Sequence, residues 1–405
     1  MQNRKKKRSK RIKRRRLYML LLIIFLVIAL PFALYMFSNK NTPFSLYLNL
    51  FKDKSQTSNL ILKDAEPEDK TKIITPDKKD EPVKSKQEPL NTEILLSSAG
   101  DCTLGSDDKY SYEDSLPYVL KKNNNDYSYF FKNVYSIFSN DDITTVNFEG
   151  TLTNSSTKAD KQFAFKAPPE YAKILSTSSI EGVNLSNNHT FDYLNNGFKD
   201  TKEALKKENI KYFGQDDTWI EEVKGVKLGF LGYKGYYNSK ELQNKIKKDI
   251  AELKSENCIV VINFHWGDEG SYQPNSTQKS LAYFSIDNGA DLIIGHHPHV
   301  LQGIEKYKNR IICYSMGNFS FGGNKNPSDK DTMIVQVKFN MQNQLFKSYD
   351  LKVIPCKISS VNYINDYKPT PVEGNKKDEL LNKINNLSKN LGFKLDGNFY
   401  NIPTN

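Results

Sequence analysis

Residues 291–300 read Asp-Leu-Ile-Ile-Gly-His-His-Pro-His-Val. The apolar run near the start of this segment predicts a buried strand, and the glycine and proline predict an exposed turn at its end. Three histidines lie in that turn: His296, His297 and His299. Because His297 and His299 are two residues apart, both imidazoles of an extended loop can reach one point. Imidazole is a common ligand of borderline metal ions, so we expect this loop to bind metal.

The other two histidines of the chain also follow apolar, strand-like runs. His189 comes after the run 182–185, and His265 comes after the run 258–264. The carboxyl ends of parallel strands meet at one edge of a sheet, where α/β proteins bind their ligands. Packing does not readily explain why all five histidines stand at strand ends, so we expect the strands to deliver them to one metal site. For His265 alone, packing beside Trp266 is an alternative.

Carboxylates and amides stand at the ends of further predicted strands. The first strand ends at Asp101, whose side chain can project into a cleft or form an Asx-turn. The second strand presents Asn147 and Glu149 on one face, because strand side chains alternate. These oxygen donors, together with the histidines, suit two borderline cations such as Mn²⁺, Zn²⁺ or Fe rather than Ca²⁺.

The segment after the third predicted strand combines amides, a histidine and an acid. Asn187 and Asn188 precede His189, and Asp192 follows three residues later. An asparagine carbonyl can bind a divalent metal, and His189 can bind metal or donate a proton. Asp192 can orient His189 through a hydrogen bond. For Asn187, capping of the following helix is an alternative.

Six motifs in chain order carry a resemblance to a known family: Gly100-Asp101; Asn147-Phe-Glu149-Gly150; Asn187-Asn-His189-x-x-Asp192; His265-Trp-Gly267-x-Glu269; Gly295-His-His-Pro-His299; and Tyr314-Ser-Met-Gly-Asn318-Phe. The chain resembles the CapA family, the bacterial capsule (poly-γ-glutamate) synthesis proteins, which are related to calcineurin-like metallophosphoesterases. The resemblance extends over about residues 94–322. It implies a four-layer αββα sandwich with a two-metal centre at the strand ends.

The resemblance also implies a role for each site residue. The metal ligands would be Asp101, Glu149, Asn188, His265, His297 and His299. The catalytic residues would be His189 as the proton donor, Asp192 beside it, and His296 as a further ligand or substrate contact. The substrate-binding and pocket-lining residues would be Asn147, Asn187, Trp266, Glu269 and Asn318.

The N-terminal residues predict a membrane anchor. Residues 1–16 contain eleven Lys or Arg and no acid. The rest of the chain has 47 of the 58 basic residues and all 47 acidic residues, so the net charge of +11 belongs to this tail. Such a distribution does not indicate nucleic-acid binding. Residues 17–37 are 21 residues without a charge, enough to cross a bilayer core of about 30 Å. The basic block before them predicts a cytoplasmic N-terminus and an extracellular C-terminal domain. A cleaved signal peptide is the alternative.

The rest of the chain divides into three parts. Residues 38–91 are rich in charged residues, Pro, Ser and Thr and predict a disordered extracellular tether. Residues 92–356 alternate strand and helix patterns and predict one α/β domain. Its last two strands lack a helix between them and predict a hairpin. Residues 357–405 predict a peripheral extension with one helix at 377–391. The four dispersed cysteines predict free buried thiols rather than disulfides or a zinc ribbon.

The leading hypothesis is a membrane-anchored extracellular CapA-like protein of capsule or poly-γ-glutamate biosynthesis. Its two-metal site would hydrolyse phosphoester or related bonds, with an anionic polymer or a phosphoester as substrate. One alternative is a non-catalytic accessory or scaffold subunit of a membrane polymer synthase or exporter. A peptidase-like action on γ-glutamyl amides is another, since a two-metal site can also polarise an amide carbonyl. The expected partners are the membrane and other membrane subunits of such a complex.

Overall fold

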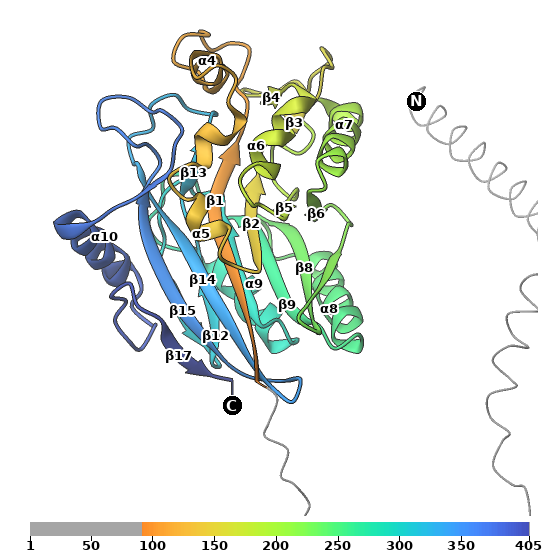
Figure 1. Cartoon of the computed structure of the whole chain (residues 1–405). Helices are drawn as coiled ribbons and strands as arrows, with labels where there is room; N and C mark the ends of the chain where they lie inside the picture. The colour runs from red at the N-terminus through yellow and green to blue at the C-terminus, as the bar shows by residue number, and fades with distance from the viewer. Residues whose placement is uncertain (1–90, 405) are drawn as a thin grey trace, which may run out of the picture. The chain divides into compact units, whose positions relative to one another are not determined.

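The computed structural model describes residues 91–404, and two β-sheets form its centre (Figure 1). The larger sheet has nine strands: β1 (Asn91–Thr103), β2 (Ile143–Phe148), β5 (Gly182–Asn184), β6 (Lys211–Phe213), β13 (Asn318–Phe321), β14 (Asp331–Gln342), β15 (Leu345–Lys357), β16 (Thr370–Pro371) and β17 (Tyr400–Pro403). The smaller sheet has six: β7 (Trp219–Val223), β8 (Val226–Gly235), β9 (Ile259–Trp266), β10 (Leu292–His296), β11 (Ile304–Tyr307) and β12 (Arg310–Cys313). Two short strands, β3 (Thr151–Leu152) and β4 (Lys166–Ala167), pair separately.

Helices cover the outer face of each sheet. Over the larger sheet lie α4 (Leu116–Lys122), η2 (Tyr127–Phe131), α5 (Tyr135–Phe138), η3 (Pro169–Ala172), α6 (Lys173–Ser176) and α7 (Leu194–Lys207). Over the smaller sheet lie α8 (Lys240–Ser255) and α9 (Ser276–Asp287). The last helix, α10 (Gly374–Leu387), contacts β15 near the edge of the larger sheet.

The alternation of side chains along β9 explains why the sheets stack. Val261 is fully buried in the core between the two sheets, whereas its neighbours Val260 and Ile262 are buried under α8 and α9. A strand that is covered on both faces reads as a continuous apolar run, as the sequence does at this place. The core therefore has the four layers that the family resemblance implies, in the order helices, sheet, sheet, helices.

The carboxyl ends of the central strands come together at one end of the two sheets. In the larger sheet, Asp101 of β1 lies beside Asn147 of β2 and Asn318 of β13. In the smaller sheet, His296 of β10 lies beside His265 of β9. Strands β1 and β10 contact each other, so the two groups of polar residues meet.

The predicted hairpin is present, and residues 127–138 form two short helices. Strands β14 and β15 pair antiparallel, and β14 also pairs with β1. A turn at 132–134 separates η2 from α5. All four cysteines are free and buried, as the sequence predicts.

The C-terminal extension is more deeply integrated than the peripheral packing that we expected. Its strands β16 and β17 both pair with β15. Its helix places Leu380, Leu381 and Ile384 in the core cluster between the sheets. The i, i+1 and i+4 spacing of these residues gives α10 one apolar face, and that face is buried.

The predicted basic tail (1–16), anchor (17–37) and most of the tether (38–91) lie outside the described residues. Among residues 91–404, no helix has the length and apolar character needed to cross a bilayer.

Candidate metal centre

Glu149, just after β2, stands at the centre of the site. It is fully buried, and neither of its carboxylate oxygens has a hydrogen-bond partner. Three imidazole Nε2 atoms face its Oε1: that of His265 at 3.6 Å, that of His189 at 3.8 Å and that of His299 at 4.0 Å. A buried carboxylate without a donor is costly. Burial is the main reason that the pKa of Glu149 rises to about 8. A cation between these groups would satisfy the carboxylate.

Asp101 is the second buried carboxylate, and it is well supplied with donors. The Asn147 amide donates to its Oδ1 at 2.8 Å, and the His297 backbone N–H donates to its Oδ2 at 3.2 Å. The Nδ1 atoms of His299 and His296 lie 3.3 and 3.4 Å from the carboxylate oxygens. Burial raises the pKa of Asp101, but the hydrogen bonds and charges of the two histidines outweigh burial and hold it well below its usual value.

The histidine loop has an uncommon backbone conformation. His297 has a φ of 97° and His299 a φ of 58°, values that non-glycine residues rarely adopt. The loop is held by a hydrogen bond from Gly270 N–H to Pro298 O at 2.8 Å. Such strain often occurs at functional sites, where the surrounding structure fixes it. Here it turns both imidazoles toward the carboxylates.

The charge state of this loop follows from its surroundings. Burial lowers the pKa of His299, but the Glu149 and Asp101 carboxylates outweigh burial and raise it to about 9. Burial and the neighbouring His299 lower the pKa of His297 to about 4. The ring of Tyr236 packs edge-on against His297, with ring centroids 5.0 Å apart.

His189 and Asp192 form a hydrogen-bonded pair. Nδ1 of His189 lies 2.7 Å from Oδ2 of Asp192, so its Nε2 is directed toward Glu149. Asp192 also accepts from Lys161 Nζ at 2.7 Å and from the Phe165 backbone N–H at 2.5 Å. Burial lowers the pKa of His189, and Asp192 opposes this effect. An imidazole oriented in this way can donate or accept a proton at Nε2.

The two consecutive asparagines have different surroundings. The Asn188 amide oxygen lies 2.7 Å from His265 Nε2, and it therefore points to the same place as Glu149. The Asn187 side chain donates to Phe148 O at 2.7 Å, and it accepts from His189 N–H at 3.0 Å and from the Thr190 hydroxyl at 3.4 Å. Asn187 is therefore buried, with its bonds made inside the loop.

Two other expected substrate contacts lie below the site. Trp266 is fully buried, stacks on Phe264, and donates its indole N–H to Tyr314 O at 2.8 Å. Asn147 is also fully buried and links Asp101 to His265, whose Nδ1 lies 3.2 Å from the amide. Neither residue lines the cavity beside the site.

Three supporting residues were missed by sequence reasoning. Asn184 donates to Asn147 Oδ1 at 2.9 Å, and Asn263 holds His296 with 3.1 Å between Oδ1 and Nε2. An asparagine inside an otherwise apolar strand was an available signal for both. Lys161 lies in an irregular segment, and no spacing marks it.

A cavity of about 430 Å³ opens beside the site. His189, His299 and Asn318 line its inner end, and Asn318 Oδ1 lies 2.9 Å from His299 Nδ1. Phe165 and Phe321 form an aromatic wall; Phe165 stacks at 4.3 Å on the ring of His189. The exposed Glu269 lies at the rim.

The donor atoms form three overlapping groups in which every ligand atom lies within 4.8 Å of the others: Glu149, His265 and His297; Asp101, Glu149 and His299; and Glu269, His297 and His299. Carboxylate oxygens with imidazole nitrogens suit borderline divalent cations. The unpartnered oxygens of Glu149 show that the residues fit such an ion. The structure thus brings together Asp101, Glu149, Asn188, His265, His297 and His299, the six residues expected as ligands.

Comparison with known proteins places this geometry in a family context. The chain is 31% identical over 282 residues to the capsule biosynthesis protein CapA of Bacillus anthracis, covering 63% of this chain and 65% of the relative, slightly under two thirds of its length. It is 32% identical over 287 residues to the PGA biosynthesis protein CapA of Bacillus subtilis, covering 65% and 72%. The structure of a purple acid phosphatase from yellow lupin aligns with this one over 69% of this chain and 54% of that chain, with a TM-score of 0.31 and 9% sequence identity. We draw no argument from a similarity at this level.

The family model described as bacterial capsule synthesis protein PGA_cap matches residues 96–323. This range begins in β1, ends just after β13, and contains every candidate ligand. The chain therefore belongs to the bacterial capsule synthesis protein family PGA_cap.

Proposed function

We propose that this protein acts in the biosynthesis of a capsule or of poly-γ-glutamate, and that its strand-end site is a metal-dependent hydrolase centre for phosphoester or related bonds. The observation that carries the hydrolase proposal is Glu149, a fully buried carboxylate without a hydrogen-bond donor that faces three imidazoles. Structural packing offers no reason to bury such a group, whereas a bound cation does.

Two divalent cations, Mn²⁺, Zn²⁺ or Fe, would be held by Asp101, Glu149, Asn188, His265, His297 and His299. When bound, they would supply a Lewis acid and an activated water. The chain contributes the proton: His189 Nε2 faces the centre and donates to the departing oxygen. Asp192 holds the ring by its hydrogen bond to Nδ1, and Lys161 holds Asp192 in turn.

The location that we propose is the cell envelope. The relatives are described as biosynthesis proteins of a capsule and of PGA. Residues 17–37 would anchor the chain in the cell membrane with the N-terminus in the cytoplasm and the C-terminal domain outside. Other membrane subunits of a polymer synthase or exporter would be its partners, with an anionic polymer or a phosphoester as substrate.

A second candidate function is that of a non-catalytic accessory or scaffold subunit of such a complex. The observation that favours it lies two residues after Asp101. Metallophosphoesterases, which the motifs resemble, carry a histidine there, but this chain has Thr103, which is fully buried. The site therefore lacks one nitrogen donor of that pattern.

The two functions differ in how they respond to Glu149→Gln, a change that keeps size and removes the charge. If the protein is a hydrolase, a strain whose only copy of the protein is this variant should make no polymer. The purified, metal-loaded variant should not hydrolyse a chromogenic phosphodiester. The matched control is Glu222→Gln, the same change on the exposed edge of β7. Full polymer production by a strain with Glu149→Gln would favour the scaffold function instead.

A further inference from the structure

The cavity beside the metal centre is bordered by an irregular segment, residues 322–330, which joins β13 to β14. Five residues of this segment line the cavity: Gly323, Asn324, Pro327, Ser328 and Asp329. Side-chain bonds hold this loop at two places. Near its start, Tyr110 donates to Gly323 O at 2.9 Å and Lys325 bonds the segment 111–113. Near its end, Asp329 accepts the bonds described next.

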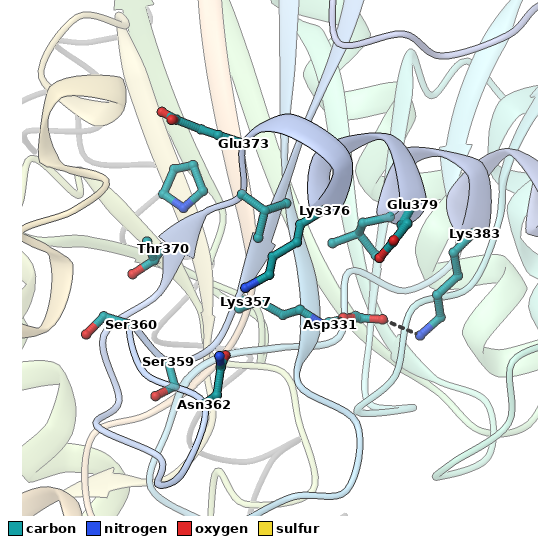
Figure 2. Close-up of a pocket in the computed structure, with 13 residues that line it drawn as sticks. Asp331, Lys357, Ser359, Ser360, Asn362, Thr370, Glu373, Lys376, Glu379 and Lys383 are labelled. Atoms are coloured by element: carbon teal, nitrogen blue, oxygen red, sulfur yellow. Dashed lines mark hydrogen bonds and ion pairs between the residues drawn. The ribbon is translucent and has the colours of Figure 1, made fainter.

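Lys383 of α10 makes the central bond. Its Nζ lies 2.9 Å from Asp329 Oδ2. It also lies 2.7 Å from Asp331 Oδ2 (Figure 2). Asp331, the first residue of β14, also binds Lys357 of β15. Residues 329 and 331 follow the family-matched range 96–323, as does Lys383, so these ion pairs lie outside the family match.

Tyr272 connects the network to a second segment of the cavity wall, since Glu269 and Gly270, just before it in the chain, line the cavity. The tyrosine hydroxyl donates to Asp329 Oδ2 at 2.8 Å, and Lys383 Nζ lies 5.1 Å from the centre of its ring. Tyr272 belongs to the segment that follows β9, three residues after Glu269. In this segment, Gly270 N–H donates to Pro298 O in the histidine loop.

The two carboxylates of this network are largely buried, whereas Tyr272 is 42% exposed. The side chains of Asp329 and Asp331 are 11% and 14% exposed, and that of Lys383 is 31% exposed. Ion pairs at this depth are screened less than those on the surface. Burial lowers the pKa of Lys383, but its bonds to the two carboxylates outweigh burial and raise it.

The helix that carries Lys383 is itself firmly placed. Leu380, Leu381 and Ile384, on the same part of α10, are buried in the core between the sheets. Because Lys383 extends from a packed helix, it can hold Asp329 and Tyr272 in place. A cavity of about 800 Å³ lies along this side of α10, and Lys383, Asp331 and Lys357 all line it (Figure 2).

We propose that Lys383 is a positioning residue for the candidate active site: through Asp329 and Tyr272 it clamps two segments of the cleft rim, 322–330 and 267–274, to the C-terminal helix. The family-matched part of the chain thus depends on its C-terminal extension for the shape of its cleft. This proposal goes beyond the proposed function, because the order of the rim can be measured whether or not the centre hydrolyses a substrate.

The test is hydrogen–deuterium exchange on the full-length chain, comparing the wild type with Lys383→Met. We expect exchange in peptides that cover 322–330 and 267–274 to rise at least about fivefold, with β1 and β9 unchanged. Lys383→Arg, which keeps the charge, should restore most of the protection. The matched control is Lys376→Met, an exposed residue of the same helix that makes no ion pair among the described residues.

Unchanged exchange in both rim segments of Lys383→Met would overturn the proposal, as would an equal rise in Lys376→Met. If Lys383→Met also loosens α10, Asp329→Asn replaces it as the test, since this change weakens the clamp without touching the helix. Rim exchange that rises in Asp329→Asn while α10 stays protected supports the clamp. Unaltered rim exchange in that variant refutes it.

Discussion

Glu149→Gln should have opposite effects on stability in the absence and in the presence of metal. Without metal, the wild-type carboxyl group is fully buried and unpartnered, so folding includes the cost of desolvating its charge or of protonating it. Mutational data place the cost of an unsatisfied buried polar group at about 1–3 kcal/mol, and more for a charged one. A neutral amide carries a smaller cost. We therefore expect the metal-free variant to be at least as stable as the wild type, by about 0–3 kcal/mol.

With metal, the wild type should be more stable than the variant. An ion that binds only the folded state at 100 times its dissociation constant adds about 2.7 kcal/mol to the free energy of unfolding. The wild type should gain this amount and the variant little or none of it, because Glu149 takes part in two of the three donor groups. Urea unfolding in EDTA and in excess Mn²⁺ measures both quantities, with Glu222→Gln as the control.

Two results would refute this reasoning. The first is a metal-free variant that is clearly less stable than the wild type, because it would mean that the carboxylate makes a stabilising contact of its own. The second is an equal gain from Mn²⁺ in both proteins, because the ion would then be bound elsewhere.

Three further predictions concern other parts of the domain. Burial raises the pKa of Asp141 from its usual 3.8 to about 7, so the folded state retains a proton that the unfolded state releases. The free energy of unfolding should therefore fall as pH rises from 3.8 through 7, and Asp141→Asn should remove about 1–2 kcal/mol of this fall in urea unfolding. A variant with the same pH profile as the wild type would contradict the assignment. His189→Gln should lower kcat by about 10²–10⁴ without reducing metal content in mass spectrometry, and a variant with full kcat would exclude His189 as the proton donor. Gly100→Ala would bring a Cβ to 2.1 Å from Gly317 O and should cost at least about 1–3 kcal/mol in thermal unfolding; an unaltered Tm would show that this backbone contact can relax.

The residues at strand ends could be predicted because their signals are local. An apolar run followed by a polar residue marks a strand and its end, and in β9 this pattern leads directly to His265. The convergence of Asp101 with His296, His297 and His299 then follows from the topology, since β1 of one sheet and β10 of the other contact each other.

The supporting residues could not be predicted, because their partners are distant in sequence. Lys161 contacts Asp192 from an irregular segment with no periodic pattern. The parallel pairing of β13 with β1 joins residues more than 200 positions apart in sequence. Residues 357–404 read as a polar extension, yet a few apolar side chains such as Ile384 are enough to bury one face of α10 in the core.

The central claim is that the strand-end site binds metal, and metal content tests it most directly. The described domain, residues 91–404, would be purified without chelator and analysed by inductively coupled plasma mass spectrometry. Its His297→Ala, His299→Ala double variant would be analysed beside it. We expect about two equivalents of a transition metal in the wild type, as for a two-metal hydrolase centre, and a large loss in the variant. A folded wild-type domain that contains no metal and cannot be reloaded with Mn²⁺, Zn²⁺ or Fe²⁺ would contradict the account.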